Sequence, residues 1–178
     1  MVRNRIAISS FVTLVSLLIS VNSPLAFAHE GHDEAVKMPK DFEMLKKLAG
    51  NWESTQKTEK GEEKTDVTYE LSAGGSIVIE KLSVGTSHEM VTVYHADGDK
   101  VAMTHYCMLG NHPTMTLKKV EGKVLTFEYS GGLKSKMEPH MHTLMITLVD
   151  EDHIQQEWVM NDKGKKVHTV NLSLTRKS

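Results

Sequence analysis

From residue 52 to residue 175 the sequence is a succession of short segments of alternating polarity, separated by clusters of turn-forming residues. The turns contain Asp-Gly, Gly-Gly and Gly-Asn pairs, which favour hairpins because these residues accept positive φ angles. Short connections between successive strands favour an antiparallel meander, and a meander this long is expected to close into a barrel. The predicted strands span residues 52–58, 65–71, 76–83, 89–95, 100–108, 114–120, 123–130, 141–149, 153–160 and 166–175.

The segment before these strands predicts one short amphipathic helix. Residues 41–50 read DFEMLKKLAG, with Phe42, Leu45 and Leu48 at helical spacing and Gly50 as a stop. The sequence therefore predicts an all-β domain over residues 41–178: an antiparallel meander barrel of eight to ten strands preceded by one short α-helix.

The N-terminal segment predicts a secretory signal peptide over residues 1–28. Arg3 and Arg5 give a positive start, a mostly apolar run follows, and Ala26-Phe27-Ala28 supplies the small residues that signal peptidase reads. Cleavage near Ala28 would place the mature chain in the periplasm or outside the cell, and an uncleaved N-terminal anchor is the alternative. Residues 29–40 are polar and without periodicity, which predicts a flexible leader.

Composition excludes several classes of partner. The formal net charge is −2 and no basic patch is evident, so a nucleic-acid partner is not indicated. No second apolar run of the required length follows residue 28, so membrane insertion of the mature chain is not expected. The single Cys107 cannot form an intrachain disulfide. The sequence does not indicate an oligomeric state.

The last three predicted strands place their apolar residues at alternate positions, so one face is expected to be continuous and inward. A three-residue loop at DED would set Leu144 opposite Trp158. A five-residue loop at NDKGK would set Trp158 opposite His168. The interior is expected to be lined by Phe127, Leu144, Ile146, Ile154, Trp158, Val170 and Leu172.

Gly50-Asn51-Trp52 after the helix, the long meander and Arg176 at its end together resemble the calycin superfamily, which includes lipocalins, fatty-acid-binding proteins and nitrobindin-like haem barrels. In lipocalins a Gly-x-Trp closes the barrel floor and an arginine from the last strand packs across the tryptophan. The resemblance implies these structural roles for Trp52 and Arg176, as a cation–π pair. The stretch HEMVTVYHADGD…MTHYC also resembles an uncharacterised family of bacterial lipocalin-like proteins, which suggests no activity.

The stretch MTHYCMLGNHPTM gathers soft metal ligands. Cys107, His112 and Met115 resemble the ligand loop of blue-copper proteins, and His105 shares a strand face with Cys107. A four-residue loop at 108–111 would make Cys107 and His112 cross-strand partners. The alternative is a hairpin whose soft side chains fill the core. The sequence HEGH at residues 29–32 has copper- or nickel-binding residue types, although a solvated leader is the favoured interpretation.

The register of His105 is left open by the turn at ADGD. A two-residue turn at Asp97-Gly98 would set His105 opposite Met90, and a three-residue loop would set it opposite Val91. This choice decides which side chains share a face with the histidine.

His168 is a second candidate ligand. Nitrobindin-like barrels hold haem iron with one histidine on the last strand, and the resemblance implies this role for His168. The glycine- and proline-rich motif that follows the first tryptophan of nitrobindins is absent from the sequence. A buried histidine hydrogen-bonded to Gln156 or to a hydroxyl group explains the same pattern.

The predicted function is non-covalent binding of a small, largely apolar molecule inside the barrel. One alternative is a haem or copper protein that uses His168 or the Cys107, His105 and His112 cluster, and another is a structural or partner-binding barrel with a filled core. No nucleophile elbow, phosphate loop, zinc signature or carboxylate pair indicates an enzyme. The predicted ligand-binding residues are Trp158, His168, His142, Gln156, Met160, Leu144, Ile146, Ile154, Val170 and Leu172.

Overall fold

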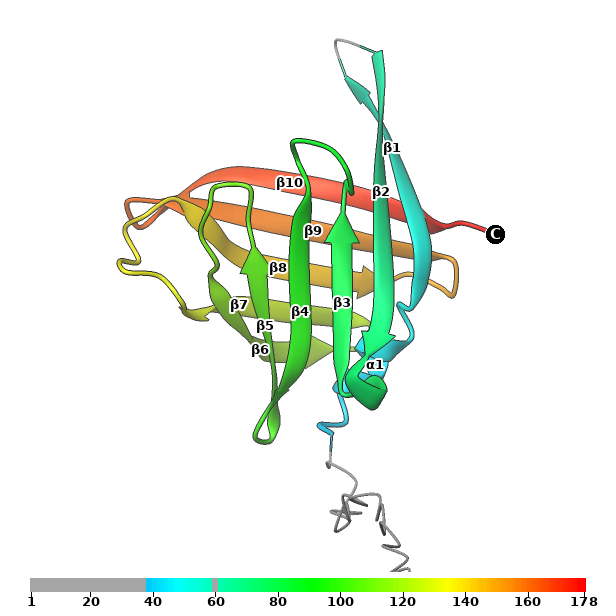
Figure 1. Ribbon diagram of the computed structural model, residues 1–178, viewed down its shortest axis with the longest axis horizontal. Helices are drawn as coiled ribbons and strands as arrows, with labels where there is room; N and C mark the ends of the chain where they lie inside the picture. The colour runs from blue at the N-terminus through cyan, green and yellow to red at the C-terminus, as the bar shows by residue number, and fades with distance from the viewer. Residues whose placement is uncertain (1–37, 59–60) are drawn as a thin grey trace, which may run out of the picture. The chain divides into compact units, whose positions relative to one another are not determined.

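The structure, a computed structural model, describes residues 38–58 and 61–178. In this part of the chain one short helix, α1 (Phe42–Lys46), precedes ten antiparallel strands that close into a barrel in meander order (Figure 1). The all-β barrel and its helix, predicted from the sequence, are thus confirmed. The strands are β1 (Gly50–Thr58), β2 (Gly61–Ser72), β3 (Ile77–Leu82), β4 (Met90–Asp97), β5 (Lys100–Tyr106), β6 (Thr114–Glu121), β7 (Val124–Gly131), β8 (His140–Leu148), β9 (His153–Asp162) and β10 (Lys165–Arg176).

The predicted signal peptide at 1–28 and the leader up to residue 37 lie outside the described residues. No helix within the described ranges has the length and apolar character needed to cross a membrane.

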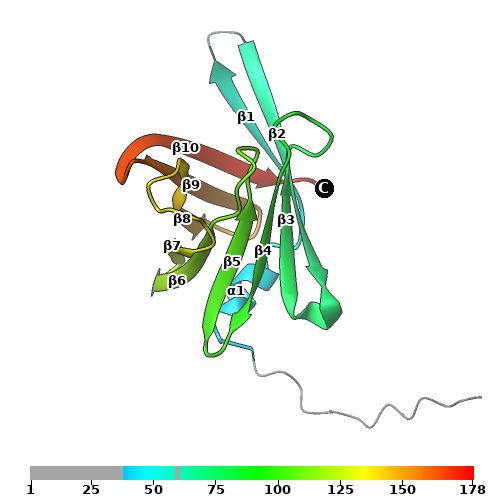
Figure 2. The ribbon, with the colours of Figure 1, turned by 60° about the vertical axis from the view of Figure 1, so that its left-hand side comes forward.

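The strand ends differ most from the prediction in the β1–β2 hairpin. β2 begins at Gly61 rather than at residue 65, and pairing with β1 continues out to Thr58 opposite Gly61. The described outer residues of β2, from Gly61 to Lys64, are exposed, and the hairpin projects beyond the other strands (Figures 1 and 2). Because no core lies against this part of the hairpin, its sequence does not alternate in polarity.

The register of the last strands is partly as predicted. Leu144 lies opposite Trp158, which confirms the three-residue loop before β9. The prediction for the next turn was wrong, because Trp158 lies opposite Val170 and His168 lies opposite Met160. β9 and β10 continue pairing through polar residues to a tight turn at Lys163-Gly164, where both residues have positive φ.

Both registers considered for His105 were wrong. The β4–β5 turn is formed by Gly98 and Asp99, because Asp97 lies opposite Lys100. Gly98 has a φ of 62°, which glycine adopts without steric cost. This register sets His105 opposite Thr92.

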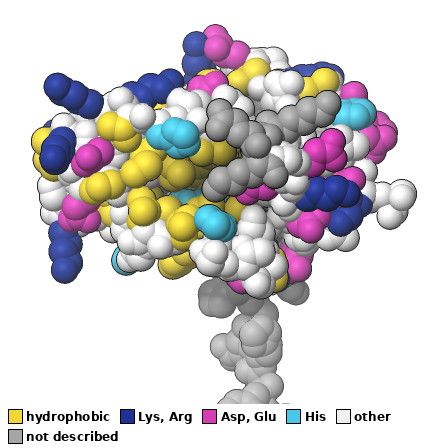
Figure 3. Space-filling model, turned by 90° about the horizontal axis from the view of Figure 1, so that it is seen from above, with side chains coloured by type: hydrophobic (Ala, Val, Ile, Leu, Met, Phe, Trp, Pro, Cys, Tyr) yellow, Lys and Arg dark blue, Asp and Glu magenta, His cyan; other side chains and the backbone are white. Residues whose placement is uncertain are grey.

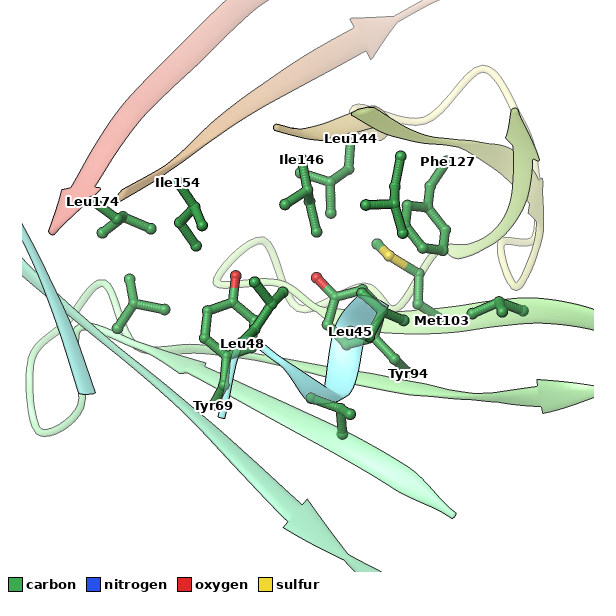
Figure 4. Packing of buried hydrophobic residues seen from close by; sticks show 14 of the residues in the cluster. Leu45, Leu48, Tyr69, Tyr94, Met103, Phe127, Leu144, Ile146, Ile154 and Leu174 are labelled. Carbon is green, nitrogen blue, oxygen red and sulfur yellow. The ribbon is translucent and has the colours of Figure 1, made fainter. Parts of the chain in front are cut away.

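The end of the barrel next to α1 is filled by side chains. Phe42, Leu45 and Leu48 are buried and join the core that the strands enclose. Figure 4 shows Leu45 and Leu48 beside Tyr69 and Tyr94, with the two tyrosine rings pointing from the β2–β4 side toward the opposite wall. The predicted interior residues Phe127, Leu144, Ile146, Ile154, Trp158 and Leu172 are all buried, and the predicted Val170 is half-buried against them.

Trp52 and Arg176 close this end as the resemblance implied. The Trp52 indole donates to the Leu48 carbonyl at 2.8 Å, and the guanidinium of Arg176 lies 4.1 Å from the centre of its ring system. Arg176 also donates to the Ala49 carbonyl at 2.7 Å. A Cβ at Gly50, where φ is 135°, would lie 2.6 Å from Arg176 Nη1. The glycine before the tryptophan therefore makes room for the arginine.

Candidate functional site

A cavity of about 400 Å³ occupies the end of the barrel away from α1. Figure 3 views this end and shows a hollow bordered by hydrophobic side chains and histidines. The volume lies within the range of ~300–1,000 Å³ that is usual for small-molecule sites. The apolar and sulfur-containing residues of its lining are Leu82, Met90, Cys107, Met108, Leu109, Met141, Trp158, Met160, Val170 and Leu172.

A second depression, of about 1050 Å³, lies at the closed end between α1 and the β8–β9 turn. It is wider and more open, and Arg176 and charged residues 150–152 form much of its lining. Within the described residues, none of the buried polar atoms that lack a partner belongs to this lining. The internal cavity is therefore the candidate site.

A buried carboxylate reaches the bottom of the cavity. Glu80 on β3 is 2% exposed; Tyr94 donates to its Oε2 at 2.5 Å and Gln156 Nε2 donates to its Oε1 at 2.8 Å. The Gln156 amide also donates to the Tyr69 hydroxyl, and its Oε1 accepts from the Trp158 indole at 3.0 Å. These bonds tie the β2–β4 wall to β9 and separate the cavity from the packed core below.

Burial shifts the pKa values of the ionisable groups in this network. Desolvation raises the pKa of Glu80 above its usual value, and the hydrogen bonds from Tyr94 and Gln156 offset part of that rise. Burial, followed by the nearby charge of Glu80, raises the pKa of Tyr69 and Tyr94 well above 10. Both tyrosines therefore remain neutral hydrogen-bond donors at physiological pH.

His105 on β5 presents an unpartnered nitrogen in the cavity wall. It is 3% exposed, its Nδ1 lies 2.9 Å from Thr92 Oγ1, and its ring packs at a tilt of 41° against Trp158, with 4.6 Å between centroids. Its Nε2 is buried without a hydrogen-bond partner. Burial lowers the pKa of His105 to about 4, so the imidazole is neutral at physiological pH. A buried polar atom without a partner costs ~1–3 kcal/mol.

Two sulfur atoms lie near this histidine on the same wall. Cys107 follows β5 and Met90 begins β4, and their Sγ and Sδ atoms are 4.0 Å apart. Burial raises the pKa of the Cys107 thiol, which keeps it protonated in the free protein. His105 and Cys107 share the inward face of the chain because they are two residues apart in an extended segment.

The structure divides eight of the ten predicted ligand-binding residues into three groups. Trp158, Met160, Val170 and Leu172 line the cavity, as do side chains from the opposite wall. Gln156 holds the network below it. Leu144, Ile146 and Ile154 lie deeper, packed within the core cluster that fills the closed half of the barrel.

The two predicted histidine ligands, His168 and His142, do not line the cavity. His168 is exposed near the β9–β10 turn, so its place does not suit the haem ligand that the resemblance implied. At β8 a bulge between Met141 and Thr143 leaves His142 without a partner residue on β9, and Met141 takes the place in the cavity wall. His142 instead lies beside His140, with Nδ1 3.1 Å from His140 Nε2.

The predicted copper cluster is only partly assembled. Cys107 pairs with Asn111 rather than with His112, because its amide donates to the Asn111 carbonyl at 3.0 Å. His112 is exposed and stacks on Tyr106 on the outer face, whereas Met115 is buried in the core opposite Met103. No three His, Cys, Asp or Glu side chains in the described ranges lie together as metal ligands.

Glu80, Thr92, Met90 and Met141 were missed by reasoning from the sequence. Glu80 stands in IVIEKL, where its parity with the buried Val78 indicates an inward position that its charge contradicts. The inward positions of Tyr69 and Tyr94 in the sequence could have indicated that their buried hydroxyl groups need a hydrogen-bond acceptor. Predicting Met90 and Thr92 as site residues required the correct β4–β5 register. Predicting Met141 required knowledge of the bulge in β8.

The fold and the cavity define a class: a closed ten-strand antiparallel barrel with an internal cavity at one end. No protein-family model and no curated protein matches the sequence. Among solved structures, the chain is similar to a protein of unknown function of the DUF3598 family from Nostoc punctiforme, with 15% identity and a TM-score of 0.42 over 75% of this chain and 48% of that one. The chain thus spans about half the length of that protein.

Proposed function

We propose that this protein binds a small, largely apolar molecule non-covalently in the cavity at the open end of the barrel, in the periplasm or outside the cell. The observation that carries the proposal is a cavity of about 400 Å³ with a mainly apolar lining and one buried, unpartnered imidazole nitrogen. Burial of apolar surface would supply the affinity, at ~25 cal/mol per Å² before the costs of association.

The polar atoms of the wall define what the molecule must carry. His105 Nε2 requires one hydrogen-bonding group on the ligand, whereas the oxygens of Glu80 are already engaged by Tyr94 and Gln156. Gln56, Glu63, Thr65, Ser83 and His88 also line the cavity. A ligand with an apolar body and one or more polar groups therefore matches the wall. The methionines of the lining are unbranched and adapt to irregular ligand shapes.

A fluorescent apolar probe, N-phenyl-1-naphthylamine, tests the cavity directly. We expect saturable binding with an increase in probe emission, and loss of at least about tenfold in affinity for Val170→Phe, because the larger ring fills space beside Trp158. Ser173→Phe is the matched control: it places the same side chain on the outer face of the same strand, where Ser173 is exposed.

Equal binding by both variants, or no binding by the unmodified protein, would contradict the proposal. Native mass spectrometry of protein purified from its own host adds a test that needs no probe, since a retained molecule appears as an additional mass. Expected is one bound small molecule that Val170→Phe fails to retain and Ser173→Phe retains.

A further inference from the structure

Two sulfur atoms lie together on one wall of the cavity, at the end of β5 and the start of β4, and an imidazole from β5 lines the same cavity. Met90 precedes Val91, which lies opposite Tyr106, so the antiparallel register brings Met90 beside Cys107. Their sulfur atoms are 4.0 Å apart, and both residues line the cavity. One rung farther along the same inward face, His105 lies opposite Thr92.

The sulfur separation matches that of two ligands of one metal ion. Two metal–sulfur bonds of about 2.3 Å that meet at about 120° separate their sulfur atoms by about 4.0 Å. The two sulfur atoms are therefore close enough to bind one ion. Met90 is half-buried and Cys107 is 9% exposed, so an ion between them would be shielded from water on the protein side.

The third donor is the nitrogen without a partner. His105 Nε2 is buried in the wall of this cavity, and the contact between Nδ1 and Thr92 Oγ1 at 2.9 Å fixes the orientation of the ring. Ligating histidines usually make such a bond through their second nitrogen, which orients the ring and sets its tautomer. Thr92 is placed to make this second bond.

We propose that Cys107, Met90 and His105 form a binding site for one Cu(I) ion. Thiolate, thioether and imidazole are the donors that select monovalent copper, whereas zinc sites require Cys, His or carboxylate ligands that do not cluster in the described residues. Binding replaces the thiol proton: a sulfur–copper bond forms, the proton passes to the solvent, and copper stays in the +1 state. Three further methionines, Met108, Met141 and Met160, also line the cavity.

This site uses one wall of the cavity proposed above for an apolar ligand, but it does not depend on that ligand. It also differs from the cluster predicted from the sequence, because Met90 takes the place expected of His112 and Met115. Occupation by copper would narrow the cavity, so the two ligands are expected to compete.

Anaerobic transfer of copper from the coloured Cu(I)–bicinchoninate complex measures the affinity. We expect uptake of one equivalent by the unmodified protein, and loss of at least about tenfold in affinity for Cys107→Ser and for Met90→Leu. His112→Gln is the matched control, since His112 belongs to the same hairpin but lies exposed on its outer face. A background with His29→Gln and His32→Gln removes the N-terminal histidines as a competing copper site.

The dependence of affinity on pH provides a second measurement. Because binding releases one thiol proton, the affinity is expected to rise by about tenfold per pH unit below the pKa of the Cys107 thiol. Cys107→Ser should abolish this slope. Ag(I), which has no accessible higher oxidation state under these conditions, is expected to bind with the same stoichiometry.

No uptake by the unmodified protein, uptake retained in full by Cys107→Ser, or an equal loss in His112→Gln would overturn the proposal. N-phenyl-1-naphthylamine binding, measured on the same preparations, separates this outcome from failure of the proposed function. Intact probe binding without copper uptake refutes the copper site alone, and copper uptake without probe binding refutes the apolar ligand alone.

Discussion

The two ends of the barrel are built from the same strands but differ in how their interiors are filled. At the end next to α1, apolar side chains fill the interior, and the N–H groups of Trp52 and Arg176 donate to backbone carbonyls. At the other end the same strands enclose a cavity, and the imidazole of His105 keeps one nitrogen without a partner. From this difference we expect the closed end to contribute more to the free energy of folding than the open end. The open end has an unfilled cavity, which is compatible with ligand binding.

Removing a ring from each end tests this division most strongly. We expect Trp52→Ala to lower the free energy of unfolding by about 3–5 kcal/mol, because the ring is fully buried and supports both α1 and Arg176. Trp158→Ala should cost less, since one side of this ring faces the cavity and has fewer contacts to lose. Urea unfolding followed by circular dichroism measures both, and equal costs would contradict the comparison.

The buried histidine of the open end should make stability depend on pH. Because its pKa falls from 6.5 to about 4 on folding, the native state binds fewer protons than the unfolded state between these values. Its contribution is therefore fully present above pH 6.5 and declines by up to about 3 kcal/mol as pH falls toward 4. His105→Gln keeps a polar group near Thr92 but cannot titrate.

The measurement for this prediction is the difference in unfolding free energy between the unmodified protein and His105→Gln at several pH values. The difference should shift in favour of the variant as pH falls from 6.5 to 4. A constant difference over that range would show that the histidine titrates normally and that the open end exposes it to water.

The outer wall gives the smallest expected effect and serves as a baseline for both ends. Lys81 Nζ lies 2.8 Å from Glu70 Oε2, with side chains that are 36% and 48% exposed. Exposed ion pairs contribute little, so Lys81→Met should change the unfolding free energy by less than about 0.5 kcal/mol. A loss above about 1 kcal/mol in the same urea experiment would show that the wall, and not only its ends, determines stability.

The fold was predictable because its determinants are local. Alternating polarity and glycine-containing turns located all ten strands, and Gly50 and Trp52 pointed to the closure that Arg176 completes. The predicted strand ends were wrong where the strands do not pack against the core. The projecting residues of β2 meet water on both faces, and for such segments polarity carries no information on pairing.

The site was less predictable because it depends on single-residue choices of register. One residue separates a turn at Asp97-Gly98 from the observed turn, and that residue decides whether His105 meets Met90 or Thr92. Likewise, one extra residue at the β8 bulge directs Met141 rather than His142 into the cavity. Long-range partners such as Glu80 and Gln156 follow only once the barrel has closed.

The seam between β1 and β10 bears on how the protein opens. Its register joins Trp52 with Arg176 and Glu53 with Thr175, whereas β9 and β10 pair along most of their length. Closing it brings together segments more than a hundred residues apart, which delays this step in folding. On the outer part of β1, the backbone amides that point toward β10 should therefore exchange with deuterated solvent earlier than those of β9, whereas the amides that point toward β2 lie in a paired ladder.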